Sequence, residues 1–395
     1  MTPLSRRSFL RLGAAGAAAL GGCSALPSGP PAEDPPEPYL TPQEKFRDVS
    51  RGRPLPHQLP PEKKAQVGLT AESWKLNVVT DPEHPAEIGK PVSLDWDGLM
   101  RLAAKRSVSF LKIMTCNNIG GALGMGLWEG VPLRDVVWLA EPKADLRRVF
   151  YYGYHNDDPK QMFRSSLPVG RVLEDPFGLP PVILCFKLNG RPLISERGGP
   201  VRIVVPETYG FKSVKWLSHV VLSNIPHAND TYADGNNDVD SHLKTFARTI
   251  SVPKEAKAGE PIRVTGYAQV GVSGLSAVET WVSRADGKWP EDDPYLARAP
   301  WAEARILPPP SRWGGDLPDG RFPETPLGFT YLHRPLRWPM PLTKAHWKAE
   351  LPGLPAGKYL FRSRTIDENG AAQPMPRPFA KSGRASIEAV PFAVV

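Results

Sequence analysis

The sequence predicts an α+β protein in which a domain of strands and short helices is followed by an all-β domain. Three observations support this fold class. Proline and glycine are abundant, with 46 Pro and 35 Gly among 395 residues, and proline inside a helix costs about 3 kcal/mol, which argues against a helical bundle. The 14 Phe, 11 Trp and 10 Tyr are enough for sizeable cores. From about residue 244, strand-like segments alternate with Asp-Gly, Pro-Gly and Asn-Gly turns, which is typical of a β-sandwich.

The first 23 residues resemble an export leader. Arg6 and Arg7 form a twin-arginine pair, and residues 12–22 are an uncharged run rich in Ala and Gly. A membrane-spanning helix needs about 20 apolar residues, so this run is typical of a signal peptide. The pattern resembles the Tat signal, which exports proteins already folded around a cofactor. We therefore expect a periplasmic protein.

The end of the leader allows two interpretations. Residues 20–22 with Cys23 resemble a lipoprotein processing box, in which Cys23 would be acylated and would tether the mature protein to a membrane. The alternative is simple cleavage after small residues, with Cys23 incidental.

Residues 24–72 form a Pro-rich extension that reads as an extended spacer. Arg51 and Arg53 in it read as part of a mobile tail, unless the segment folds over a pocket. The first domain is expected over residues 73–243. The second is expected over 244–395, with a Pro-, Gly- and Trp-rich insertion at about 289–342 that is too long for an ordinary loop.

Periodicity and turn residues predict the elements of both domains. Asn189-Gly190 supplies the positive φ of a type I′ hairpin turn between residues 182 and 193. Pro132 suits the first turn of a short helix. In chain order the first domain is expected to hold a strand at 74–79, a helix at 95–105, a buried strand at 107–114, a turn into a short helix at 128–137, the hairpin, and strands at 201–205 and 213–221. In the second domain, strands are expected at 262–268, 277–282 and 359–366.

The charge pattern excludes some function classes. The formal net charge is +8, three of the arginines lie in the leader, and no basic run is interleaved with aromatic residues. Nucleic acid is therefore not an expected partner, and the basic balance suits an anionic cofactor or substrate.

The cysteines differ in their surroundings. Cys116 follows a predicted strand and opens the polar, glycine-bearing loop 116–121, whose amides can approach an anion or a metal centre. Cys185 lies in Val-Ile-Leu-Cys-Phe and reads as a small buried apolar residue. A disulfide between Cys116 and Cys185 is the competing interpretation. The His and Cys spacings do not fit zinc, and hydrolase and P-loop motifs are absent from the sequence.

Five blocks of the first domain together resemble the sulfite oxidase family of molybdopterin enzymes, in order and spacing, over about residues 74–222. These blocks are Met114-Thr115-Cys116-Asn117-Asn118, Leu127 to Leu133, Leu188-Asn189-Gly190-Arg191-Pro192-Leu193, Gly198 to Pro206, and Tyr209 to Leu217. Segments at 266–268, 278–279 and 364–374 look like the immunoglobulin-like C-terminal domain of that family. The resemblance thus implies a sulfite-oxidase-type molybdopterin-binding domain followed by an immunoglobulin-like β-sandwich.

The resemblance also implies site residues. Cys116 would ligate molybdenum, which suits a soft thiolate, and the metal would transfer one oxygen atom while two electrons pass to a carrier. The residues expected to bind the cofactor, with its phosphate met by the last three, are Asn117, Asn118, Arg197, Arg202, Ser213 and Lys215. Without the match of the five blocks, the charged residues of this set would be interpreted as solvent-exposed side chains at the ends of strands.

Several positions depart from the family pattern. Family members usually have arginines just after the ligand cysteine, yet residues 117–121 contain none. Arg197 stands where a histidine is typical, and Leu243 where a tyrosine is expected. His155 and Asp157 lie where the family lines its pocket, so they read either as proton shuttles or as a loop cap.

The leading hypothesis is a periplasmic molybdenum oxidoreductase that transfers oxygen atoms to or from a sulfur oxyanion or related sulfur compound. A sulfoxide reductase, for example of methionine sulfoxide, is the rival among enzymes, and a non-catalytic surface binding module is the rival from another class. The sequence has no Cys-x-x-Cys-His haem motif, so a separate periplasmic electron carrier is expected. Relatives typically dimerise through the C-terminal sandwich, which makes a homodimer a further expectation.

Overall fold

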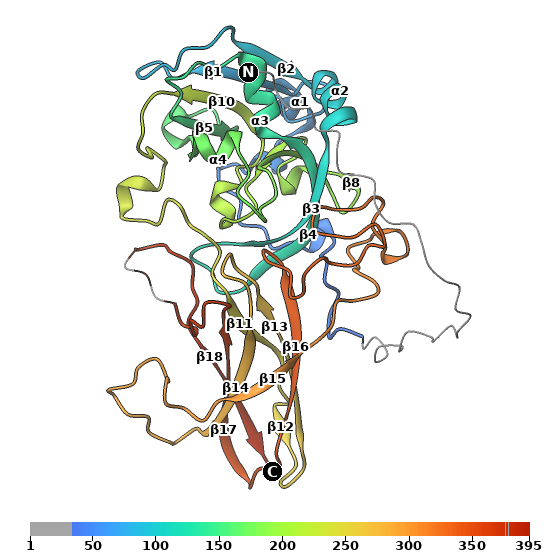
Figure 1. Cartoon of the computed structure of the whole chain (residues 1–395), viewed down its shortest axis with the longest axis vertical. Helices are drawn as coiled ribbons and strands as arrows, with labels where there is room; N and C mark the ends of the chain where they lie inside the picture. Colours follow the sequence, from blue (N-terminus) through green and yellow to red (C-terminus); the bar gives the residue numbers. More distant parts are fainter. Residues whose placement is uncertain (1–33, 376, 378) are drawn as a thin grey trace, which may run out of the picture. The chain divides into compact units, whose positions relative to one another are not determined.

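The computed structural model describes residues 34–395 except 376 and 378, and the strands of this part form three sheets (Figure 1). The leader and Cys23 lie outside the described residues. The α-helices in the described part are α1 Pro61–Gln66, α2 Trp96–Arg106, α3 Leu133–Val137 and α4 Val169–Leu173. None of these helices has the length and apolar character needed to cross a membrane.

The first sheet has the strand order β2-β1-β10-β5-β6. Its strands are β1 Lys75–Thr80, β2 Val92–Asp95, β5 Arg148–Gly153, β6 Arg164–Pro168 and β10 Leu217–Ser223. β1 runs parallel to β10, and the other pairs are antiparallel. The predicted strand at 74–79 is confirmed as β1, whose Leu76 and Val78 point into one buried face as its alternating pattern requires.

The predicted helix at 95–105 is confirmed as α2. Asp95 caps it, because its carboxylate accepts a hydrogen bond from the Gly98 amide at 2.8 Å. The helix ends at Arg106, and β3 starts two residues later. Its Leu99 is fully buried in the core beneath the first sheet.

The second sheet has the order β3-β4-β7-β8, with β9 paired to β7. Its strands are β3 Val108–Thr115, β4 Ala122–Pro132, β7 Ile183–Leu188, β8 Arg191–Pro192 and β9 Arg202–Val204. The buried strand at 107–114 is confirmed as β3. The hairpin is also confirmed, since Asn189 and Gly190 both have positive φ, at 55° and 74°.

Two predicted elements are wrong in part. Residues 128–137 were expected to be a turn into a short helix, but the first part of this range is the end of β4, which pairs with β7. A Cβ at Gly130 would lie 2.2 Å from the Leu184 carbonyl oxygen. Glycine there permits close strand pairing rather than a turn, and α3 follows after Pro132. The strand expected from residue 213 begins only at Leu217, because Trp216 has a φ of 53°.

The third sheet contains the all-β second half in the order β11-β13-β16-β15-β14-β17-β18-β12. Its strands are β11 Phe246–Ser251, β12 Glu255–Ala256, β13 Ile262–Gln269, β14 Ala277–Arg284, β15 Ala302–Ile306, β16 Lys344–Leu351, β17 Gly357–Ile366 and β18 Glu388–Val394. β15 pairs with both β14 and β16, so the eight strands are continuous. The strands expected at 262–268, 277–282 and 359–366 are confirmed.

The Pro-rich extension and the insertion pack together, so the expectation of a free spacer is wrong for the described residues. Tyr39 and Leu40 are fully buried in one apolar cluster with Trp313 and Phe329 of the insertion. The Leu40 amide donates to the Trp313 carbonyl at 2.8 Å. Apolar side chains between the prolines thus bury this stretch, although its composition favours an extended chain.

Candidate functional site

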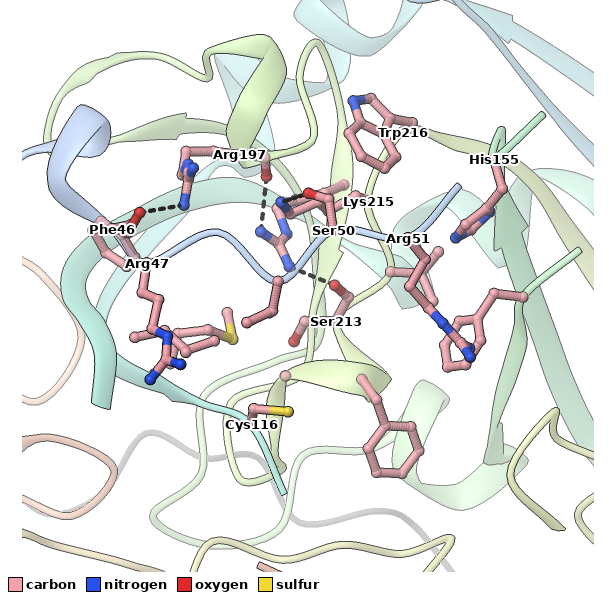
Figure 2. Close-up of a pocket in the computed structure, with 18 of the residues that line it drawn as sticks. Phe46, Arg47, Ser50, Arg51, Cys116, His155, Arg197, Ser213, Lys215 and Trp216 are labelled. Carbon is pink, nitrogen blue, oxygen red and sulfur yellow. Dashed lines mark hydrogen bonds between the residues drawn. The ribbon is translucent and has the colours of Figure 1, made fainter. Parts of the chain in front are cut away.

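A pocket of about 120 Å³ opens beside Cys116, at the end of β3 (Figure 2). The Cys116 side chain is partly exposed and reaches this pocket, and its thiol donates a hydrogen bond to the Asn118 amide oxygen. Cys116 and Cys185 are both free thiols, so the disulfide interpretation is wrong. Burial raises the pKa of Cys185 to about 12, which fits its expected apolar role.

Cationic side chains from four parts of the chain line this pocket. They are Arg47 and Arg51 from the N-terminal segment, Arg197 from the turn after β8, Arg202 on β9, and Lys215 before β10. The apolar part of the lining includes Phe46, Met114, Phe163, Phe211, Trp216 and Tyr232. The sulfur of Cys116 therefore faces a pocket in which cationic side chains and aromatic rings alternate, with Arg51 over the rings of Phe163 and Tyr232.

Arg202 and Ser213 both line the pocket and contact each other. The Arg202 guanidinium donates to the carbonyl oxygens of Arg197 at 2.8 Å and Ser213 at 2.5 Å. It also lies 5.4 Å from the ring centre of Trp128. Burial lowers the pKa of Arg202 to about 10. The Ser213 hydroxyl accepts a hydrogen bond from the Val205 amide at 3.1 Å, and these contacts fix the loop before β10 against β9.

Lys215 is held by the N-terminal segment. Its ammonium lies 3.0 Å from the Asp48 carboxylate and 2.6 Å from the Ser50 hydroxyl, and it donates to the Glu196 carbonyl at 2.5 Å. Burial, followed by the positive charge of Arg202, lowers the pKa of Lys215 to about 7. Burial opposes ionisation of Asp48, but the hydrogen bond from Ser50 and the charge of Lys215 outweigh it, so the pKa of Asp48 falls to about 2.

Several buried polar atoms near the pocket have no hydrogen-bond partner among the described residues. They are the Nε of Arg197 and both amide atoms of Asn117. A buried polar atom without a partner costs about 1–3 kcal/mol, so a ligand that satisfied it would be favoured. Arg197 is otherwise held through a hydrogen bond from its Nη1 to the Phe46 carbonyl at 3.0 Å.

His155 and Asp157, which the sequence paired, lie in different surroundings. His155 is buried in the pocket wall, its Nδ1 lies 3.1 Å from the Gly153 carbonyl, and burial lowers the pKa of its ring. Asp157 is exposed and forms an ion pair with Lys63 at 3.0 Å. Of the two, only His155 is brought to the pocket. Asn118 is exposed at its rim, beside the thiol that it contacts.

The most important wall that the sequence did not identify comes from residues 46–51, which we term the N-terminal strap. Phe46 packs edge-to-face on Trp128, with ring centres 5.8 Å apart. Arg51 places its guanidinium 4.7 Å from the ring centre of Phe163. Gly52 has a φ of 110°, and a Cβ there would lie 2.6 Å from the His155 carbonyl oxygen. The Arg-Gly-Arg run at 51–53 was the only local sign that this segment approaches a site.

The sequence analysis also did not identify Tyr232 and Phe163 as pocket residues, and Leu243 does not line the pocket. Tyr232 packs edge-to-face on Phe163, with ring centres 5.3 Å apart, and both line the pocket. Leu243, at the position where a tyrosine was expected, is buried in the cluster that holds Tyr39 and Trp313. No local sequence pattern marks residues 163 and 232 as pocket residues, because they are far apart in the sequence and come into contact only in the folded chain.

Comparisons with known proteins agree with this geometry. Residues 63–231 match the family model of the oxidoreductase molybdopterin binding domain. The chain is similar to mitochondrial sulfite oxidase of Rattus norvegicus, with 30% identity over 214 residues that cover 49% of this chain and 35% of that protein. It is also similar to the NADPH nitrate reductase of Fusarium oxysporum, with 33% identity over 107 residues, covering 27% and 11% of the two chains.

A solved structure shares the fold over a longer stretch. The sulfane dehydrogenase SoxCD from Paracoccus pantotrophus superposes with a TM-score of 0.57 at 17% identity, covering 85% of this chain and 82% of that chain. By contrast, the alignments to the rat and Fusarium proteins span about a third or less of those proteins' own length.

Proposed function

Because the chain belongs to the sulfite oxidase family of molybdopterin-dependent oxidoreductases, we propose that it transfers an oxygen atom to or from a small sulfur compound. The single observation that carries this proposal is the free thiol of Cys116, which reaches a pocket lined by five cationic side chains. A thiolate is a suitable molybdenum ligand, and cationic groups suit the phosphate of the pterin.

The residues present fit the cofactor. Cys116 would supply the protein ligand to molybdenum, and Arg202, Ser213 and Lys215 would meet the phosphate. The unpartnered atoms of Arg197 and Asn117 offer further hydrogen bonds, and Asn118 would steady the thiol. When bound, the cofactor supplies the two-electron chemistry of oxygen-atom transfer. His155, neutral because burial lowers its pKa, would accept or donate a proton at the pocket wall.

The charge at the mouth of the pocket supports a sulfur oxyanion such as sulfite as substrate. Arg51 is exposed there and has no carboxylate partner among the described residues, so it can pair with an anion. It would replace the arginines that the loop 117–121 lacks. The sulfoxide reductase remains the second candidate, since Phe163, Trp216 and Tyr232 give the pocket a neutral aromatic wall.

We further propose a periplasmic location reached by the twin-arginine route, supported by the leader sequence, and acylation of Cys23. A separate electron carrier would take or supply the electrons, because the chain carries no haem motif. We also propose that residues 244–395 form an immunoglobulin-like sandwich, supported by the all-strand sheet, and that copies pair through it as a homodimer.

Metal content and a cysteine replacement test the proposed function. Protein from a molybdate-fed host able to make the cofactor should hold about one molybdenum per chain. Cys116→Ser should abolish turnover and leave the thermal unfolding temperature unchanged, because the side chain is only partly buried. Cys185 does not line the pocket, so Cys185→Ala should keep both metal and turnover. Absence of molybdenum in the parent protein would favour a non-catalytic binding module, and retained turnover in Cys116→Ser would show that another residue is the ligand.

The role of Arg51 is tested by its substrate dependence. Arg51→Gln should raise KM for sulfite at least about tenfold, the cost of losing one charge-assisted hydrogen bond, with little change in kcat. KM for methionine sulfoxide should stay the same. Arg53→Gln is the matched control, because Arg53 is exposed and does not line the pocket. Equal sulfite KM values in the two variants would refute an anion-binding role for Arg51.

A further inference from the structure

The insertion, coloured orange in Figure 1, carries a group of exposed apolar side chains. Tyr331, Leu332 and Leu336 are 84%, 61% and 69% exposed, and Leu327 is 41% exposed. Single exposed apolar residues are common on protein surfaces, but four of them within ten residues are a concentration typical of an interaction site. We call residues 327–337 the apolar tip.

Backbone hydrogen bonds give the apolar tip a defined conformation. The Thr330 amide donates to the Arg334 carbonyl at 2.8 Å, and the Leu336 amide donates to the Gly328 carbonyl at 2.9 Å. At the base, Phe329 is buried against Trp313, with ring centres 5.5 Å apart. The exposed side chains are therefore presented by a folded segment with its own buried anchor.

The apolar tip itself carries two arginines and no acidic residue, and residues 325–349 contain no Asp or Glu. Arg337 pairs with Glu368 from another segment, while Arg334 is exposed. The nearest acidic residue in sequence is Glu324. Leucine and tyrosine side chains with arginine beside them are the composition of segments that lie in the interface of a bilayer. The arginine suits anionic headgroups.

The course of the N-terminal chain brings it to the same part of the insertion. The Tyr39 ring lies 5.7 Å from the ring of Trp338, which directly follows the apolar tip. The described chain begins at residue 34, 11 residues after Cys23. The chain that follows the proposed acylation site therefore leads into the segment that packs beside Trp338.

We propose that the apolar tip docks on a lipid bilayer that carries anionic headgroups. Tyr331, Leu332 and Leu336 enter the interface, and Arg334 contacts the headgroups. This docking does not depend on the oxygen-transfer chemistry. It would be a second membrane contact beside the proposed acyl group, and stable anchoring of peripheral proteins usually takes two such signals.

Vesicle flotation tests the proposal with a chain that begins at residue 24, which keeps every described element and lacks both leader and Cys23. The chain should float with vesicles of phosphatidylcholine mixed with phosphatidylglycerol. Leu332→Ser combined with Leu336→Ser should lower binding at least about tenfold, because burial of each leucine is lost. Arg334→Gln should lower binding to the mixed vesicles and leave binding to pure phosphatidylcholine unchanged.

Phe177→Ser is the matched control, because Phe177 is fully exposed on a different loop and should not affect flotation. All variants change exposed side chains, so their thermal unfolding temperatures should equal that of the parent. No flotation of the parent chain, or an equal loss in Phe177→Ser, would overturn the proposal. A parent that is dimeric in solution and becomes monomeric in the leucine variant, without binding vesicles, would show that the apolar tip joins two copies of the chain instead.

Discussion

Asp230 ties together the segments that carry one side of the pocket, and we predict that Asp230→Ala will be strongly destabilising. One carboxylate oxygen of Asp230 accepts from the Lys212 ammonium at 2.7 Å and from the Ser165 hydroxyl at 3.1 Å. The other accepts from the Ser166 hydroxyl. Lys212 and Asp230 are both almost completely buried. Lys212 immediately precedes Ser213, and Tyr232 follows Asp230 by two residues, so the pair positions both pocket residues.

The expected loss follows from the charge left behind. Removing one partner of a buried ion pair costs about 3–5 kcal/mol, because the other charge remains buried and uncompensated. The entropy of unfolding is about 2.1 cal/mol/K per residue, so a part of roughly 360 residues should lose about 5 °C in unfolding temperature. Burial already lowers the pKa of Lys212, and Asp230 raises it. Without Asp230, the unfolded state binds more protons than the folded state, so the variant should regain stability as pH rises.

Thermal unfolding followed by circular dichroism measures this loss. The matched control is Asp157→Ala, which breaks the exposed ion pair with Lys63 and should cost less than about 1 kcal/mol. Lys212→Met combined with Asp230→Ala should recover at least half of the lost stability, since no unpaired ammonium remains. Equal shifts for the Asp157 and Asp230 variants, or a double variant no more stable than Asp230→Ala, would refute the reasoning.

Two further predictions concern the pocket lysine and the thiols. Burial lowers the pKa of Lys215 to about 7 from 10.5, so between these values the unfolded state binds more protons and stability rises with pH. Urea unfolding of cofactor-free protein should show this rise, reduced in Lys215→Met by up to about 1.4 kcal/mol per pH unit. Burial also lowers the pKa of Lys112 to about 7, but Lys112 is present in both proteins, so identical slopes would contradict the shift of Lys215. Iodoacetamide at neutral pH should modify Cys116 but leave Cys185 unmodified until the chain unfolds, because Cys185 is buried and its pKa is raised to about 12. Mass spectrometry that found Cys185 modified at the rate of Cys116 would contradict this burial.

Local sequence patterns were sufficient to predict the helices, strands and turns that depend mainly on neighbouring residues. The cap at Asp95, the alternation in residues 75–80 and the Asn189-Gly190 turn each determine the backbone through their immediate neighbours. They were therefore predicted to within a few residues. Cys116 was also identified as a candidate site residue, because a cysteine at the end of a buried strand beside a glycine-bearing loop is a local feature.

The parts of the site that were not predicted depend on contacts between distant segments. The start of β10 was misplaced because Trp216 has a positive φ that follows from its packing and from no turn residue. The N-terminal strap was expected to be part of a mobile tail because the extension around it is rich in proline, while its position comes from the contacts of Phe46 with Trp128 and of Asp48 with Lys215. Asp157 was expected at the pocket because the resemblance places its segment in the pocket lining, but its side chain is exposed to solvent.

The N-terminal strap has a practical consequence for how this protein is produced. The stretch after a cleavable leader is commonly shortened or exchanged as a linker when an expression plan is drawn up. Here trimming past residue 39 would remove the Tyr39 ring that packs on the insertion, and trimming past residue 48 would delete part of the pocket wall together with the carboxylate that holds Lys215. A preparation made that way would lack activity for reasons unrelated to its metal supply.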